Sequence, residues 1–301
     1  MLSFCHGEKR CAKAKYVFML YYITPREELL KPSKELEGTS HADDEKYVYR
    51  YVPLYSLLST NTECDKLYMK RLDKWNDPFE KKVLTANYYC KGQKHAFHHP
   101  LANNVYGICF TENYNCEAQW YYYGQKEPIV LISVKLEKLL DALDKCKEYF
   151  YIGRVDYCVQ NEIQKKIAQC VLANLETFQK NRSTDFTSDE CKALLRPLLF
   201  KRLPFVYERE IRILKVGNSA ENDKDVENIL LKESFRNLIG KVTISPFVPE
   251  KFDNTQKSQK ELLLKEGFVK QQINISQLHA DQKPSNIYLE NYKSKNKQYE
   301  E

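Results

Sequence analysis

Glycine and proline are scarce in this 301-residue sequence, which contains 9 glycines and 11 prolines. This scarcity excludes a collagen-like chain and a low-complexity disordered chain. Hydrophobic residues make up 43% of the sequence and charged residues 29%, so most of the chain can fold around a buried core. At this length we expect one domain with additions or two small domains.

Long apolar runs are also absent, and no segment approaches the ~18 apolar residues that a membrane-spanning helix requires. The run from Tyr16 to Ile23 follows several basic residues, as in a secretory signal. However, this run is short, contains three tyrosines and lacks a following small-residue cleavage site. We therefore expect a cytoplasmic protein without a membrane partner.

The ten cysteines show neither a paired CxxC spacing nor a compact array. Several occupy apolar positions of predicted strands and helices, which favours reduced thiols packed as small hydrophobic side chains. His95, His98 and His99 lie in a polar loop without matched cysteine or acidic spacing, so we expect no metal cofactor.

The charge of the chain is only mildly positive, with 47 Lys and Arg residues against 41 Asp and Glu residues. The basic residues are interleaved with acidic ones, whereas nucleic-acid-binding proteins usually gather positive charge into a stripe. The sequence therefore gives no strong nucleic-acid signal. It also contains no P-loop, GxGxxG, GxSxG or HExxH motif.

The order of the expected elements predicts an α+β fold, with strands first, helices grouped in the middle of the chain and strands again after them. We expect an amino-terminal extension and linker over residues 1–46, a single core domain over 47–280 and a polar tail over 281–301. Strand patterns occupy residues 47–52, 66–70, 105–111, 129–134, 149–155, 208–216, 241–245 and 267–275.

Two polar and aromatic clusters could carry chemistry. The segment from Trp75 to Glu80 contains Asn-Asp-Pro and predicts a rigid corner with Trp75 and Phe79 buried, although Asp77 or Glu80 could also line a site. Farther along, a strand delivers Thr111 into a turn, and the next helix carries Gln119, Trp120 and Tyr123 on adjoining faces. That pattern fits either a hydroxyl beside an aromatic platform or ordinary core packing.

Charged residues within two strand patterns need an explanation. Glu208, Glu210 and Arg212 share one face of a predicted strand. They either pair with one another or place two carboxylates in a cleft, where burial and repulsion raise one pKa. Arg50 is a lone cation within an aromatic strand, so it either pairs with an acid or binds a phosphate or carboxylate.

Several motifs occur in the order found in a known family. They are Tyr49-Arg-Tyr, Trp75-Asn-Asp-Pro-Phe-Glu, Cys109-Phe-Thr, Gln119-Trp with Tyr122 and Gly124, Tyr207-Glu-Arg-Glu-Ile-Arg and Ile239-Gly-Lys-Val. Taken together over residues 47–275, they resemble the bacterial domain of unknown function 2971 family, whose name carries no activity.

A looser resemblance connects Arg50, Thr111 and the Glu208-x-Glu210 pair with ADP-ribosyltransferases of the Arg, Ser, Glu type. It implies a mixed, mainly antiparallel split sheet that binds NAD or a related nucleotide. Arg50 would hold phosphates, Glu210 would orient the ribose and Glu208 would prepare an unknown, macromolecular acceptor, with Tyr51 or Trp120 stacked on the nicotinamide. The alternative is a non-catalytic module that binds protein or nucleic acid, with the charged strand residues as a structural network.

The cysteine and histidine patterns predict a core that folds without metal or disulfides. Thermal unfolding should therefore keep the same midpoint when a chelator or a reductant is added. A midpoint that falls sharply with either reagent would contradict this expectation.

Overall fold

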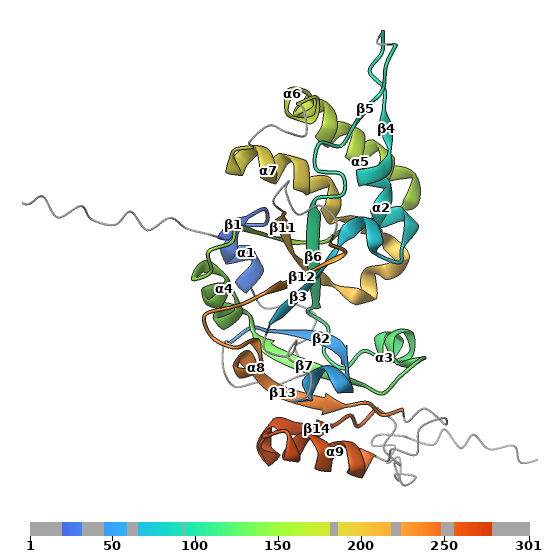
Figure 1. Ribbon diagram of the computed structural model, residues 1–301. Coiled ribbons are helices and arrows are strands. Elements are labelled where there is room, and N and C mark those ends of the chain that lie inside the picture. The colour runs from blue at the N-terminus through green and yellow to red at the C-terminus, as the bar shows by residue number, and fades with distance from the viewer. Residues whose placement is uncertain are drawn as a thin grey trace, which may run out of the picture.

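The computed structural model describes residues 20–31, 45–58, 66–92, 94–180, 186–217, 224–247 and 256–278. These residues form an α+β fold around one large mixed sheet of mostly antiparallel strands (Figure 1). The predicted fold class is confirmed at this level. The polar tail and most of the linker before Tyr47 lie outside the described residues.

The large sheet contains ten strands in the described part of the chain. Only the two outermost pairs of its main path, β1 with β8 and β13 with β14, are parallel. The main path runs in the order β1 (Leu20–Tyr22), β8 (Phe150–Arg154), β11 (Glu210–Val216), β6 (Val105–Thr111), β2 (Tyr47–Pro53), β7 (Ile129–Lys135), β13 (Ile239–Ile244) and β14 (Ile273–Ile275).

The sheet forks at β6. One edge of β6 pairs along its whole length with β11, from Thr111 opposite Glu210 to Val105 opposite Val216. The other edge is divided between β2, which pairs at Thr111, and β3 (Leu67–Arg71), which pairs at Gly107 and Tyr106. Within the described residues, positions 108–110 of β6 have no strand partner on that edge. The last strand, β12 (Val226–Ile229), extends the β3 branch.

Helices cover the sheet in two groups, each above its own part of the core. The first group packs on the main core and consists of α1 (Arg26–Leu30), α4 (Leu136–Asp144), α8 (Phe235–Leu238) and α9 (Gln256–Lys265). The second packs over β6, β8 and β11 and consists of α2 (Pro78–Thr85), α5 (Gln160–Ala173), α6 (Leu175–Phe178) and α7 (Ser188–Leu195). A capping box precedes α7, because Thr187 and Glu190 bond each other's backbone amides.

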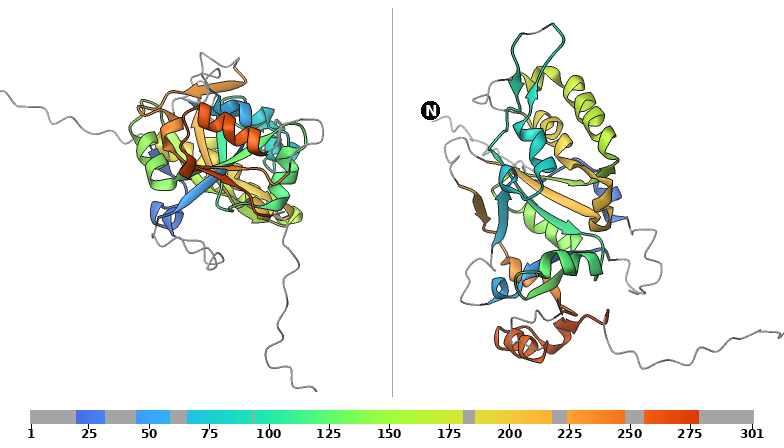
Figure 2. Two further views of the ribbon diagram at one scale, coloured as in Figure 1. Left: turned by 90° about the horizontal axis from the view of Figure 1, so that it is seen from below. Right: turned by 90° about the vertical axis from the view of Figure 1, so that its right-hand side faces the viewer.

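The remaining elements are short. Helix α3 (Glu117–Gly124) packs on β2 over a small aromatic core. Two-stranded sheets are formed by β4 (Asn87–Tyr88) with β5 (Phe97–His98), and by β9 (Asp156–Cys158) with β10 (Phe200–Arg202). The 3₁₀ helices are η1 (Leu54–Leu57), η3 (Leu72–Lys74), η4 (Arg196–Leu199), η5 (Leu203–Glu208) and η7 (Lys270–Gln272). The β4–β5 hairpin and α9 lie at opposite ends of the molecule (Figure 2).

Residues 20–31, which the sequence assigns to an amino-terminal extension, pack against the core. Strand β1 pairs with β8, and both Leu20 and Leu29 are buried in the main core. The Nη2 group of Arg154 also donates a hydrogen bond to the carbonyl oxygen of Glu28 (3.2 Å).

The Asn-Asp-Pro segment forms the expected corner, but Phe79 is not buried and Trp75 is only partly buried. Asp77 caps α2 by accepting a hydrogen bond from the Phe79 amide (2.8 Å), and Pro78 occupies the first turn. This geometry turns Phe79 outward, where it is 39% exposed and the Arg202 guanidinium lies 4.1 Å from its ring. The expectation of a buried Phe79 was therefore wrong.

These positions predict different costs for two phenylalanine truncations. Phe178→Ala removes a fully buried ring and should lower the free energy of unfolding by about 3–5 kcal/mol. Phe79→Ala should cost about 1 kcal/mol, because it removes an exposed ring and one cation–π contact. Urea denaturation of both variants checks the contrast, which equal losses would contradict.

Candidate functional site

A cavity of about 480 Å³ opens where the sheet forks. Strands β2, β3 and β6 contribute residues to its wall, among them Arg50, Lys70 and Cys109. The corner before α2, the end of α3, and the segment from β10 to β11 supply the rest. The further lining residues that bear on its chemistry are Tyr68, Trp75, Asp77, Glu80, Tyr122, Tyr123, Lys201, Arg202, Phe205, Glu208 and Glu210.

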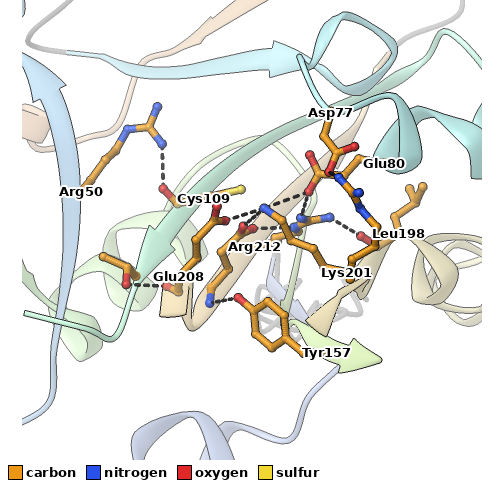
Figure 3. A network of polar contacts seen from close by, with 12 residues as sticks. Arg50, Asp77, Glu80, Cys109, Tyr157, Leu198, Lys201, Glu208 and Arg212 are labelled. Carbon is orange, nitrogen blue, oxygen red and sulfur yellow. Dashed lines mark hydrogen bonds and ion pairs between the residues drawn. The ribbon is translucent and has the colours of Figure 1, made fainter. Parts of the chain in front are cut away.

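Three of the six residues singled out from the sequence line this cavity: Arg50, Glu208 and Glu210. Glu208 and Glu210 are near neighbours in sequence, at the end of η5 and the start of β11. Arg50 lies far from them in sequence, on β2, and Figure 3 shows it together with Glu208. Thr111, Tyr51 and Trp120 do not line it. The fork therefore brings the basic and acidic residues together but leaves the expected hydroxyl and aromatic platform outside.

Arg50 is held by the unpaired edge of β6. Its Nη1 group donates a hydrogen bond to the carbonyl oxygen of Cys109 (2.7 Å). On this edge of β6, none of the described strands pairs with Cys109. Burial lowers the pKa of the Arg50 guanidinium. In the described part of the chain, neither Arg50 nor Lys70 has a carboxylate within ion-pair distance. Two basic side chains of the cavity are thus available to an anionic ligand.

Opposite Arg50, a buried charge cluster forms the acidic wall (Figure 3). Lys201 Nζ contacts Glu208, Glu210 and Glu80, the last at 3.3 Å. Arg212 bonds Glu80, Glu210 through Nε (2.9 Å) and the Leu198 carbonyl oxygen (2.6 Å). The five charged side chains are at most 10% exposed, so the cluster is shielded from water.

A local turn brings Glu208 beside Glu210. Arg209 adopts a left-handed conformation (φ 42°) between η5 and β11, so Glu208 ends a 3₁₀ helix and is not part of the strand. The Thr111 hydroxyl donates to the Glu208 carbonyl oxygen and accepts a hydrogen bond from the Asn113 amide (3.0 Å). Thr111 therefore fixes the turn that carries Glu208, and it does not itself line the cavity.

The two neighbouring carboxyl groups differ in acidity. Burial, reinforced by Glu210, raises the pKa of Glu208 to about 8. Burial also disfavours ionised Glu210, but the charges of Arg212 and Lys201 outweigh it and hold the Glu210 pKa well below its usual range. Glu210 is therefore an anion at neutral pH, whereas Glu208 can exchange a proton there.

Tyr51 and Trp120 belong to the small core beneath α3. Trp120 is 1% exposed and donates to the Asn115 side chain (2.8 Å), and Tyr51 packs edge-on against it with ring centres 4.8 Å apart. The cavity is instead lined by Tyr122 and Tyr123, and Tyr123 stacks on Tyr51 with ring centres 5.7 Å apart. Tyr51 therefore packs against the cavity-lining residue Tyr123 on the side away from the cavity.

The corner before α2 is both structural and part of the cavity. Asp77 caps the helix and also forms an ion pair with Arg202 (3.1 Å), while Trp75 and Glu80 line the cavity beside it. Gly107 allows this packing, because a Cβ atom there would lie 3.0 Å from the Trp75 ring.

From the sequence, Lys201 and Tyr122 were not expected in the site, and Tyr123 was considered only as a neighbour of Trp120 on the same helix. Lys201 lies on a three-residue strand, which is too short to show a pattern. The run Tyr121-Tyr-Tyr123 could have predicted aromatic residues at a surface or cavity, because three consecutive aromatic residues on one helix cannot all face the core.

Comparison with protein-family models, curated proteins and solved structures found no match to this chain. The two resemblances stated from the sequence therefore stay predictions. Among the described residues, no His, Cys, Asp and Glu side chains are grouped so that they could hold a metal ion. None of the described helices is long and apolar enough to cross a membrane.

The charge cluster predicts a large cost for losing Arg212. Arg212→Leu leaves the Glu80 and Glu210 carboxylates without their shared partner and should lower the free energy of unfolding by about 3–5 kcal/mol. Arg26→Leu, which removes a half-exposed arginine paired at 3.6 Å, is the control and should cost about 0–1 kcal/mol. Urea denaturation measures both, and a loss below 1 kcal/mol for Arg212→Leu would contradict a buried network.

Proposed function

We propose that the cavity binds NAD or a related nucleotide and that the protein is an ADP-ribosyltransferase-like enzyme with a macromolecular acceptor. One observation carries the proposal: Arg50, which no carboxylate of the described chain neutralises, and the Glu208–Glu210 pair line the same cavity from separate elements. The resemblance to ADP-ribosyltransferases requires the arginine and the glutamates to line one cavity. An arginine with a purely structural role would not need to lie near these glutamates.

The lining suits the parts of a dinucleotide. Arg50 and Lys70 offer cationic donors for phosphate oxygens, and the planar fork of Arg50 can bind two of them at once. Aromatic side chains, including Trp75, Tyr123 and Phe205, offer flat surfaces for a base or a nicotinamide ring. The cavity volume of about 480 Å³ lies within the range of small-molecule sites.

The carboxyl pair suits glycosidic bond cleavage. When the bond between ribose and nicotinamide breaks, its electron pair leaves with the nicotinamide nitrogen and positive charge develops on the ribose. The Glu210 carboxylate can stabilise that charge because Arg212 and Lys201 keep it ionised. Glu208 in its ionised form can accept the proton of the attacking acceptor group.

The alternative function is a non-catalytic module that binds protein or nucleic acid. It is favoured by the contacts of Glu210, whose Oε1 bonds Lys201 and whose Oε2 bonds Arg212. In such a module, the charged cluster serves only to hold η5, β10 and α2 against the sheet.

Two substitutions separate binding from turnover. Arg50→Ala should weaken NAD binding by roughly 10-fold to 100-fold, because a charged hydrogen bond contributes about 1.5–3 kcal/mol. Glu210→Gln should retain binding but lower the rate of nicotinamide release by roughly 10²-fold to 10³-fold, because its charge matters mainly in the transition state. Calorimetric NAD titration and an assay of nicotinamide release measure the two effects.

The controls address folding and charge. Arg50→Lys keeps the positive charge without the fork and should bind with intermediate affinity. Arg26→Ala lies outside the cavity and should leave both measurements unchanged. The transferase proposal fails if the unmodified protein neither binds NAD nor releases nicotinamide with any acceptor tried, and the binding-module alternative then stands.

A further inference from the structure

The buried charges beside the cavity do not balance when every group is ionised. The cluster joins three carboxylates, those of Glu80, Glu208 and Glu210, to two cations, Lys201 and Arg212. Each of these side chains is nine-tenths buried or more. An uncompensated buried charge is costly, and neutrality within the cluster requires one additional proton.

The contacts identify the carboxylate that holds this proton. Glu80 touches both cations, with its Oε1 atom 3.3 Å from Lys201 Nζ and in contact with Arg212. Glu210 also touches both cations. In the described part of the chain, Glu208 contacts Lys201 as its only cation. The negative charge of Glu208 is therefore the least neutralised of the three carboxylate charges.

We propose that the cluster holds one exchangeable proton, which resides on Glu208. We also propose that Lys201 is a positioning residue, whose charge keeps the other two carboxylates ionised. The part that this proton plays in acceptor activation rests on the proposed transferase function. Its presence does not, because it follows from contacts within the chain itself.

The other titratable groups around Glu208 do not supply the missing positive charge. Tyr123 of α3, Tyr157 of β9 and Tyr207 of η5 face it, and burial raises the pKa of each phenol, so all three are neutral near pH 8. Cys109 of β6 lies beside Glu210, and burial raises the pKa of its thiol well above the usual value. Arg50 lines the same cavity, and the charge of Glu210 acts on it, but in the described part of the chain it forms no ion pair with any of the three carboxylates.

The position of Lys201 determines how many protons the three carboxylates hold. Its Nζ atom touches all three carboxylates, so its loss leaves them with Arg212 alone. Three carboxylates with one cation require two protons for neutrality, and the second would reside on Glu80 or Glu210. Lys201→Arg keeps the positive charge, so the cluster should still hold one proton.

The proton can be observed directly by titrating the side-chain carboxyl carbons of ¹³C-glutamate-labelled protein, without NAD. We expect one carboxyl signal to titrate near pH 8 and to be absent from Glu208→Gln. Lys201→Met should bring a second carboxyl signal above pH 6, and Lys201→Arg should not. A Glu208 signal that titrates near the ordinary glutamate value of about 4.3 would overturn the proposal.

Stability provides a second readout that does not depend on Lys201→Met folding. Because the pKa of Glu208 is higher in the folded state, its proton stabilises the fold at low pH, and this stabilisation is lost as pH rises towards about 8. Glu208→Gln mimics the protonated acid and should flatten this part of the pH dependence of the unfolding free energy. An unchanged slope would count against the proposal.

Glu112→Gln is the matched control, because Glu112 is also buried but contacts two cations, Lys46 and Arg154 (2.8 Å). It should leave the Glu208 signal in place. Since none of these measurements involves a ligand, a protein that fails to bind NAD can still pass them. Failure of the transferase proposal and failure of the proton proposal are therefore distinguishable.

Discussion

The unpaired edge of β6 is the constraint on which the site depends. Buried backbone carbonyls need partners, and residues 108–110 of β6 have no neighbouring strand to supply them in the described chain. Arg50 satisfies one by donating to the Cys109 carbonyl oxygen. The same gap keeps β2 and β3 apart and leaves room for the cavity between them. One interruption in strand pairing thus accounts both for the cavity and for the arginine at its wall.

The charge cluster makes the opposite wall rigid. Glu80 comes from α2, Lys201 from β10 and Arg212 from β11. The two ion pairs of Glu80 therefore join elements that the backbone hydrogen bonds of the sheet do not connect. Buried ion pairs contribute little net stability, but breaking one is costly, which favours a single arrangement of these elements. The two carboxylates that face the cavity are consequently held in fixed positions and in different protonation states.

Much of the framework could be predicted from sequence, because strands such as β6, β7 and β11 carry strong local patterns. Arg50 and Glu210 were found because a charge in an apolar strand needs a partner. The fork could not be foreseen, since strand pairing is non-local. Helical spacing placed Trp120 and Tyr123 on adjoining faces without showing which one faces the core, and the structure buries Trp120.

The two walls of the cavity impose different demands on a ligand. At β2 and β3, Arg50 and Lys70 lack carboxylate partners in the described chain, so a negatively charged group would be stabilised there. At η5 and β11, the anion of Glu210 and the proton-exchanging Glu208 favour a group that is, or becomes, positively charged. A ligand that meets both demands is anionic at one end and carries developing positive charge at the other. A dinucleotide whose phosphates bind Arg50 and whose ribose approaches Glu210 has this polarity, whereas a simple anion would gain nothing from the acidic wall.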